Sequence, residues 1–352
     1  GTAQILSLST SQVNANLIVR NITFQNGATS QNGGALQAAV SGASIAIEYC
    51  EFNDNVATSS ESVGGGANLY SDIGTISVFS CTFRRNTSNG NVGGLYVGTD
   101  TGVIQLTGSV FEQDQAANTG GSGAFGDAGG AMLYGDGACR ITARQNTFEN
   151  NTASGGENPD GGGMMTYQLG AASALTIEGN TFTNNRAGLG GAGCYTRITN
   201  SGSALFRNNS FTGNSTLVGS GAGSYIHIND GTLNYTGNSY SDNDCAEDGG
   251  GALINFLAGN ASIAGNVYAL NDAANNGGGL VVTTDSATVS LSRNIFAANT
   301  AGNVGGGLSY ATMNGTSTCS NNTWYDNFAP TDGGGAYLYF DQTAAQSTLK
   351  NN

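Results

Sequence analysis

The stretch Asn294-Ile-Phe296-Ala-Ala-Asn299-Thr-Ala301-Gly-Asn-Val-Gly305-Gly-Gly-Leu308 decides the fold, because its pattern returns along the whole chain. The consensus is Asn-Thr-Phe-x-x-Asn-x-Ala, a variable stretch, and then Gly-Gly-Gly/Ala-Leu. A repeat with a period of roughly 20 to 50 residues is the signature of a solenoid, in which each copy stacks on its neighbours. The aromatic residue of the pattern occurs at Phe24, Phe52, Phe83, Phe111, Phe148, Phe182, Phe211, Tyr240, Tyr268, Phe296 and Trp324.

Polar residues keep a fixed place beside each aromatic. An Asn or Asp stands three positions after all but the first aromatic, and an Asn stands two positions before the later ones, where earlier copies have Cys50, Cys81 and Ser109. The residues three positions after the aromatic are Asn55, Asn86, Asp114, Asn151, Asn185, Asn214, Asn243, Asn271, Asn299 and Asn327.

These positions predict a stacked architecture. In a parallel β-helix, equivalent residues of successive coils lie about 4.8 Å apart. The aromatics then form a ring stack in the core, and the asparagines form a ladder of hydrogen-bonded amides. The Gly-Gly pair supplies positive φ or close approach where the coil turns. We therefore expect an all-β chain, residues 1–352, that forms one continuous β-helix of about eleven coils with about 28–30 residues per coil.

Composition agrees with many short strands and excludes several functions. The chain has 57 Gly and 2 Pro in 352 residues, and only 10% of its residues are charged. Lys and Arg total 10 against 24 Asp and Glu, so the formal net charge is −14. Such a surface repels phosphate backbones, and we expect no nucleic-acid partner. No run approaches the 18 or so apolar residues of a membrane-spanning helix, and no transmembrane segment is expected.

The repeat resembles a known family. Phe52-Asn-Asp-Asn55 followed by Gly65-Gly66-Ala67, and Trp324-Tyr-Asp-Asn327 followed by Gly333-Gly-Gly-Ala336, are similar to the repeats of the chlamydial polymorphic outer membrane proteins and of related microbial surface proteins. The resemblance covers nearly the whole chain. It implies a right-handed parallel β-helix that acts as a surface-exposed passenger or adhesin-like domain.

Nine Asn-x-Ser/Thr sequons are candidate sites for N-linked glycans. Asn21, Asn208 and Asn321 lie opposite in strand parity to the inward aromatic and should face solvent, and Asn150 precedes the ladder and should also be exposed. Asn86 and Asn214 are themselves ladder residues, so we expect them to be poor acceptors. The sequons that register does not place are Asn234, Asn260 and Asn314.

The six cysteines offer one disulfide candidate. Cys50 and Cys81 share a register position on adjacent coils, which brings their Cα atoms within bridging range, although stacked side chains point in parallel. Cys245 takes the small inward position that other copies fill with Ala, and is expected to be a buried thiol. Cys139, Cys194 and Cys319 find no partner by register. No Cys/His cluster predicts a zinc site.

The chain is poor in catalytic residues. Polysaccharide lyases and hydrolases need paired carboxylates, or a basic residue beside acidic calcium ligands. The single His227 lies in an alternating segment and is expected to be a solvent-facing strand residue. We therefore predict no catalytic residues and no required cofactor.

Two coils with longer turns are the candidate sites for binding a ligand. Longer turns at about 115–128 and 154–160 should leave the rod at the same corner, and they carry Asp127, Glu157 and Asp160. Insertions in a repeat rod often form a binding face. The three carboxylates are candidates for calcium or partner binding, and a tolerated insertion is the other interpretation.

The two ends suggest how the rod is used. The last copy, ending Ser347-Thr-Leu-Lys-Asn-Asn352, stops inside the repeat, and the first begins without a cap. Solenoids normally close with capping repeats. We expect either a segment of a longer rod or ends completed by another subunit, which would give head-to-tail filaments. The sequence favours a non-catalytic, extracellular, glycosylated structural or adhesive cell-surface element; the alternative is a carbohydrate-active or carbohydrate-binding β-helix.

Overall fold

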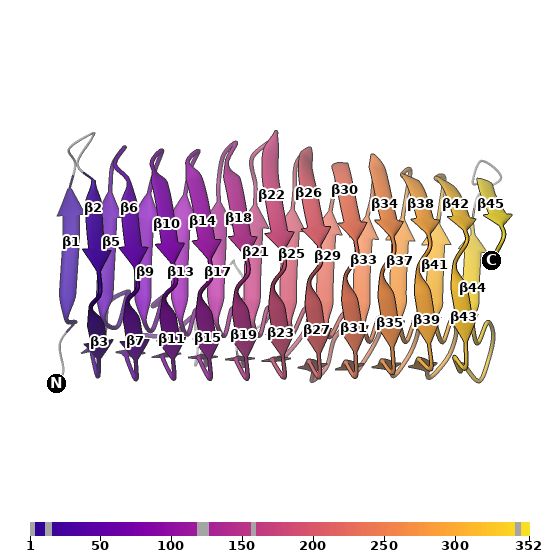
Figure 1. Cartoon of the computed structure of the whole chain (residues 1–352), viewed down its shortest axis with the longest axis horizontal. Coiled ribbons are helices and arrows are strands. Elements are labelled where there is room, and N and C mark those ends of the chain that lie inside the picture. Colours follow the sequence, from indigo (N-terminus) through magenta and orange to yellow (C-terminus); the bar gives the residue numbers. More distant parts are fainter. Residues whose placement is uncertain (1–3, 11–15, 118–126, 156–159, 342–345) are drawn as a thin grey trace.

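The computed structural model describes residues 4–10, 16–117, 127–155, 160–341 and 346–352. Every regular element in these residues is a β-strand, and every pairing joins parallel strands of successive coils in four long sheets. The strands stack along one axis in a regular rod (Figure 1). The predicted all-β parallel β-helix is confirmed.

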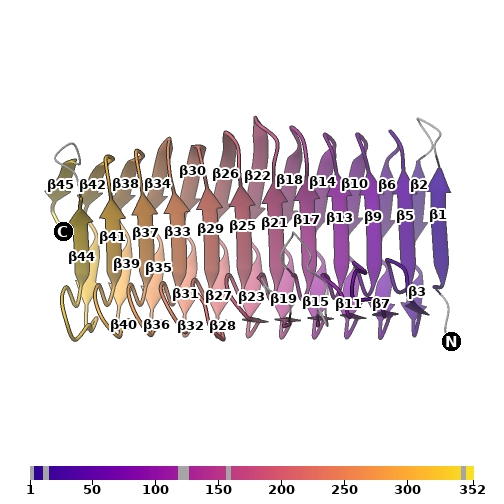
Figure 2. The same cartoon turned by 180° about the vertical axis from the view of Figure 1, so that it is seen from behind.

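The rod is right-handed. In Figure 1, β5 (Leu36–Val40) rises on the far side and β6 (Ile45–Glu48) descends on the near side, while successive coils advance from left to right. Figure 2 shows the same coils from behind, with the strands that follow the Gly-Gly pair in front.

Each complete coil gives one strand to each of the four sheets, which are called A, B, C and D in the order in which the chain passes through them. The coil that includes Phe296 contains β37 (Leu280–Thr284), β38 (Thr288–Ser292), β39 (Ile295–Ala297) and β40 (Thr300–Ala301). Sheet B runs from β2 (Leu17–Arg20) to β45 (Gln346–Lys350), sheet C from β3 (Thr23–Gln25) to β43 (Thr323–Tyr325), and sheet D from β4 (Ala28–Thr29) to β40. Besides β5 and β37, sheet A comprises β1 (Leu6–Thr10), β9 (Ala67–Ser71), β13 (Leu95–Thr99), β17 (Ala131–Gly135), β21 (Met164–Gln168), β25 (Cys194–Ile198), β29 (Ser224–Ile228), β33 (Ala252–Phe256), β41 (Leu308–Thr312) and β44 (Ala336–Phe340).

The aromatics of sheet C form one continuous stack in the core. Ring centroids of successive coils, from Phe24 to Trp324, lie between 4.5 and 5.7 Å apart with nearly parallel planes. Each stacked pair contributes about 0.5–1.5 kcal/mol beyond its buried area. The aromatic residue that recurs in each repeat therefore sets the register in which successive coils stack.

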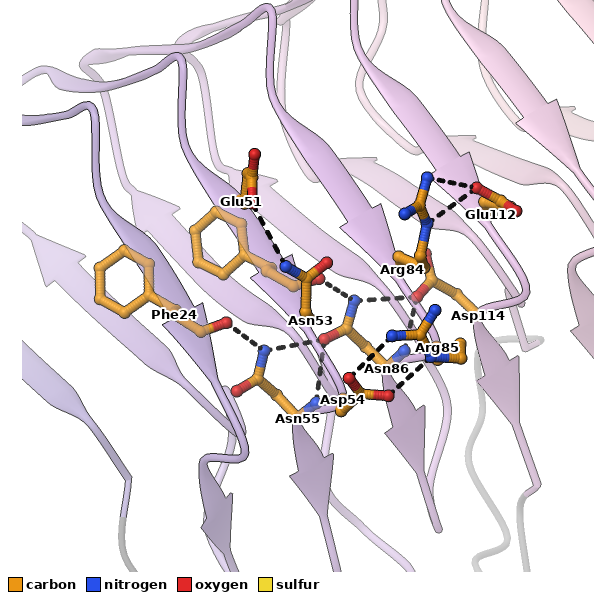
Figure 3. A network of polar contacts seen from close by, with 11 residues as sticks. Phe24, Glu51, Asn53, Asp54, Asn55, Arg84, Arg85, Asn86, Glu112 and Asp114 are labelled. Carbon is orange, nitrogen blue, oxygen red and sulfur yellow. Dashed lines mark hydrogen bonds and ion pairs between the residues drawn. The ribbon is translucent and has the colours of Figure 1, made fainter.

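The ladder at the corner between sheets C and D is also as predicted. Asn86 donates from Nδ2 to the carbonyl oxygen of Phe52 and to Oδ1 of Asp114, both at 2.9 Å, and its own Oδ1 accepts from the amide of Asn55 (Figure 3). Asp114 has no Nδ2, and its backbone amide donates to Oδ1 of Asn151, from which the same pattern continues coil by coil to Asn327. Buried amides are thereby satisfied without water.

A second ladder lies at the corner between sheets B and C. It consists of the asparagines two positions before the aromatic, from Asn146 through Asn322 to Asn352, and each Nδ2 also donates to a carbonyl of the preceding coil. Cys50, Cys81 and Ser109 replace the amides in the first coils. The thiols of Cys50 and Cys81 contact the carbonyls of Val19 and Ile47, in the place of Nδ2.

Both roles expected of the Gly-Gly pair occur in the quoted copy. Gly305 has φ 66°, and a Cβ on Gly306 would come within 2.4 Å of the Phe328 carbonyl oxygen. The sequence did not predict a second feature: the residue before each ladder side chain is also left-handed. Arg293 before Asn294 and Ala298 before Asn299 have φ of 56° and 50°. These left-handed residues turn the chain so that the next side chain points inward.

The first of the two longer turns begins later than the sequence indicated. Gln115–Ala116 form β16 of sheet D and pair with Thr152–Ala153 of β20, so the extra residues of that coil follow Ala116. Residues 118–126 and 156–159, which make up most of both turns, lie outside the described residues. Both turns connect sheet D to sheet A.

Candidate binding groove

The outer face of sheet A carries two columns of large side chains. Strand register aligns Gln37, Asn68, Tyr96, Met132, Met165, Tyr195 and Tyr225 in the first column, and Ala39, Tyr70, Gly98, Tyr134, Tyr167, Arg197 and His227 in the second. Outward positions of a solenoid strand ordinarily bear small or charged side chains. Here Met132, Met165 and Tyr167 are buried and form an apolar cluster separate from the core.

Three tyrosines converge where the second column has no side chain. A Cβ on Gly98 would lie 2.9 Å from both Cε1 and Oη of Tyr96 and 3.1 Å from Cδ2 of Tyr70, so the Tyr96 ring leans into the gap. Tyr70, Tyr96 and Tyr134 line a cavity of about 340 Å³ together with Met132. The amides of Asn32, Gln37, Asn68 and Asn91 also line it. The cavity thus combines aromatic surface with neutral hydrogen-bonding groups.

Carboxylates hold two of these tyrosines from the corner between sheets A and B. Tyr70 donates its hydroxyl to Oδ1 of Asp100 at 2.5 Å, and Tyr134 donates to Oδ1 of Asp136 at 3.5 Å. Burial, with the charge of Asp136, raises the pKa of Tyr134 to about 12. The phenols are therefore neutral donors fixed in orientation, beside an acidic rim.

A second, separate cavity of about 250 Å³ lies on later coils, at β25, β29 and the turns that precede them. It is lined by Asp160, Tyr195, Ser220, Tyr225 and Glu247. Tyr195 and Tyr225 stack at 5.2 Å, and Ser220 lies 3.3 Å from Oε2 of Glu247. Burial raises the pKa of Asp160 to about 7, against the lowering effects of a hydrogen bond from the Gly190 amide and the charge of Arg197. Two carboxylates of different environment therefore line one cavity.

The apolar Met165 and Tyr167 lie between the two cavities, and polar side chains follow them in the second column. The Arg197 guanidinium lies 5.5 Å from the centroid of Tyr167, which itself stacks on Tyr134 at 6.0 Å. His227 is half-buried at an outward position, and its Nε2 lies 2.7 Å from Oδ1 of Asn229; burial lowers its pKa. Within the described chain, Nε of Arg197 and Oδ1 of Asn255 are buried without a hydrogen-bond partner.

Two of the three calcium candidates lie in the part of the chain that the structure describes. Asp127 is buried, Asp160 lines the second cavity, and Glu157 lies outside the described residues. In the ranges that the structure describes, no three His, Cys, Asp or Glu side chains are grouped so that they could hold a metal ion. Over the same ranges, no helix is long and apolar enough to cross a bilayer.

The sequon asparagines in the ladder are buried and those outside it are exposed, as expected. Asn86 and Asn214 are fully buried in the ladder. The seven other sequon asparagines are exposed: Asn21, Asn150, Asn208, Asn234, Asn260, Asn314 and Asn321. Four of them, Asn21, Asn150, Asn208 and Asn321, are the left-handed corner residues described above.

The proposed Cys50–Cys81 bridge is wrong in this structure. All six cysteines are buried free thiols. Cys50 and Cys81 do occupy successive ladder positions, where their thiols interact with each other and each sulfur also contacts a carbonyl of the preceding coil. Cys245 is buried between Ala222 and Ala273, as its small inward position predicted.

Comparison of the chain with protein-family models, with curated proteins and with solved structures gives no match.

Proposed function

We propose that the protein is a non-catalytic β-helical rod, a structural or adhesive element of a cell surface or extracellular appendage. The observation that carries the proposal is the repeated interior: a ring stack runs through successive coils, and two amide ladders use buried polar side chains for contacts between coils. Seven exposed sequons are compatible with an extracellular, glycosylated surface. The resemblance of the repeats to microbial surface proteins points the same way.

End-to-end association is part of this proposal. Leu349 of β45 pairs in register with the inward Cys319, and it is 59% exposed. Leu338 and Phe340 of β44 are only partly buried at the same end, and Leu6, Leu8 and Leu17 are partly buried at the other. A second copy stacked head to tail would cover both apolar ends and pair the free strand edges.

Electron microscopy over a range of protein concentrations tests this association. We expect rods of roughly 50 Å, from about eleven coils at about 4.8 Å each, to join into longer filaments as concentration rises. Leu349→Asp should abolish the lengthening. Leu217→Asp, a matched change at a 57% exposed leucine in a turn on the side of the rod, should leave it intact. Uniform short rods at every concentration would contradict end-to-end assembly.

A carbohydrate-active enzyme is the second candidate, and the second cavity favours it. Glycoside hydrolysis uses two carboxyl groups, one of which is protonated near neutral pH, and Asp160 with a pKa of about 7 shares a cavity with Glu247. Shortening of a polysaccharide by the purified protein, lost in both Asp160→Asn and Glu247→Gln, would establish this function. A lack of cleavage over neutral and acidic polysaccharides supports the non-catalytic rod.

A further inference from the structure

The groove on sheet A is built differently from the rest of the rod surface. Sheet B presents mainly Thr, Ser and charged side chains with ion pairs, such as Arg144 with Glu178 at 3.1 Å, and its cavity of about 540 Å³ is lined by Arg140, Arg144 and threonines without an aromatic ring. Sheet A instead places six tyrosines and two methionines on adjacent coils, from β9 to β29, and two cavities open among them. Met132, Met165 and Tyr167 are buried in an apolar cluster outside the core, whereas the tyrosines that line the two cavities are only partly buried.

We propose that this groove binds a neutral, unbranched glycan lying along the rod axis, with its main subsite at Tyr70, Tyr96 and Tyr134. This goes beyond the structural role, since a rod could assemble whether or not the groove is occupied. The subsite is the cavity of about 340 Å³ around Gly98.

The side chains that line the first cavity match the chemistry of a sugar. Pyranose rings have apolar C–H faces and a rim of hydroxyls, so they are matched by aromatic rings alternating with amides and phenols that both donate and accept. Asn68 and Gln37 stand in the same column as Tyr96, one and two coils before it. A ligand along this column would meet an amide, an amide and an aromatic ring at steps of about 4.8 Å.

Charge excludes acidic glycans from this subsite. No Lys or Arg is among the residues that line the first cavity, while Asp100 and Asp136 hold its phenols and the whole chain has a net charge of −14. An anionic polymer would meet carboxylates without a compensating cation.

A peptide ligand is less well matched. Extended peptides gain affinity by pairing with a free sheet edge, but β9, β13 and β17 are each paired on both sides. A proline-rich peptide, which docks on aromatic grooves without edge pairing, is the competitor that the experiment must separate.

Gly98 provides a test that leaves the tyrosines in place. Its φ is not in the left-handed region, so a side chain is compatible with the backbone. Gly98→Val would displace the Tyr96 ring from the gap and fill the subsite. Tyr96→Ala removes the ring itself. Tyr325→Ala is the matched control, because Tyr325 is exposed on sheet C, on another face of the rod.

Isothermal titration calorimetry with the full chain would use cellohexaose, laminarihexaose, mannohexaose and xylohexaose, and hexagalacturonic acid and decaproline as competitors of other chemistry. We expect at least one neutral hexasaccharide to bind with Kd of about 1 mM or tighter. Tyr96→Ala and Gly98→Val should each weaken it at least about tenfold, and Tyr325→Ala should not. Circular dichroism and the unfolding midpoint of each variant verify the fold.

The proposal is overturned if no neutral hexasaccharide binds at about 5 mM, if binding survives both groove variants, or if hexagalacturonic acid or decaproline binds more tightly. None of these results tests the proposed structural role of the rod. That role is tested separately, by measuring filament growth of the same Tyr96→Ala and Gly98→Val proteins.

Discussion

Asp114 is the one carboxyl in a column of amides. Its Oδ1 accepts from the backbone amide and Nδ2 of Asn86 at 2.7 and 2.9 Å, as an asparagine would. Its Oδ2 takes the place of an amide nitrogen and is buried without a partner within the described chain. On the next coil, Nδ2 of Asn151 occupies the equivalent position and donates to the carbonyl of Phe111. The position of Oδ2 is therefore suited to a hydrogen-bond donor, and Oδ2 faces acceptors. Burial raises the pKa of Asp114 well above its usual range.

We predict that Asp114→Asn stabilises the protein in a pH-dependent way. Because the pKa is raised by folding, the wild-type carboxyl is fully accommodated only below its unfolded pKa of about 3.9, and its contribution is lost as pH rises through the folded pKa. The variant should match the wild type at pH 3 and exceed its free energy of unfolding by about 1–3 kcal/mol at pH 7. Denaturant titrations at the two pH values measure this. A difference independent of pH would contradict the proposed protonation.

At the scale of elements, the two ladders are the main polar contribution to cohesion between coils. Asn214 accepts from the backbone amide and Nδ2 of Asn185, and donates to the carbonyl of Phe182 and to Oδ1 of Asn243, all within 3.0 Å. Removing this side chain leaves several buried groups unpaired at once.

Asn214→Ala should therefore lower the free energy of unfolding by about 3 kcal/mol or more, since each buried group left unpaired costs about 1–3 kcal/mol. Asn303→Ala is the control: it removes an amide that bonds to Asn276 at 3.0 Å, but at an exposed position. We expect the control to cost less than about 0.5 kcal/mol. Equal losses in thermal or denaturant unfolding would show that burial in the ladder is not what matters.

The inward half of each coil could be predicted from the sequence, and the outward half could not. Ring stack and ladder repeat the same residue types at fixed offsets, so their positions are visible without coordinates. The groove depends on neighbours such as Tyr96 and Met132, which are 36 residues apart because a long turn separates them. Outward side chains do not recur, and only the strand register shows which of them meet. The left-handed corners could not be predicted because Leu270, Arg293 and Ala298 are not residues typical of positive φ.

At the scale of the whole molecule, exposure predicts where glycans can attach. When the chain is expressed through a eukaryotic secretory pathway, we expect glycan at exposed sequons such as Asn208, Asn234 and Asn260, and none at Asn86 and Asn214. Site-by-site mass spectrometry with and without enzymatic deglycosylation measures occupancy. Modification of Asn86 or Asn214 would mean that the ladder is open when the glycan is added.

The ladders also give the rod an electrical direction. Every ladder Oδ1 accepts from the coil before it, and each asparagine Nδ2 donates to the Oδ1 of the coil after it wherever the ladder continues, so the side-chain carbonyls all point toward the N-terminal end. A peptide-like amide carries a dipole of about 3.5 D, and aligned dipoles add. The rod is thus a permanent dipole whose two ends differ, and such rods turn to one orientation in an electric field. Two copies placed tail to tail would oppose these dipoles, whereas copies in series extend them, which gives any filament of this protein a polarity.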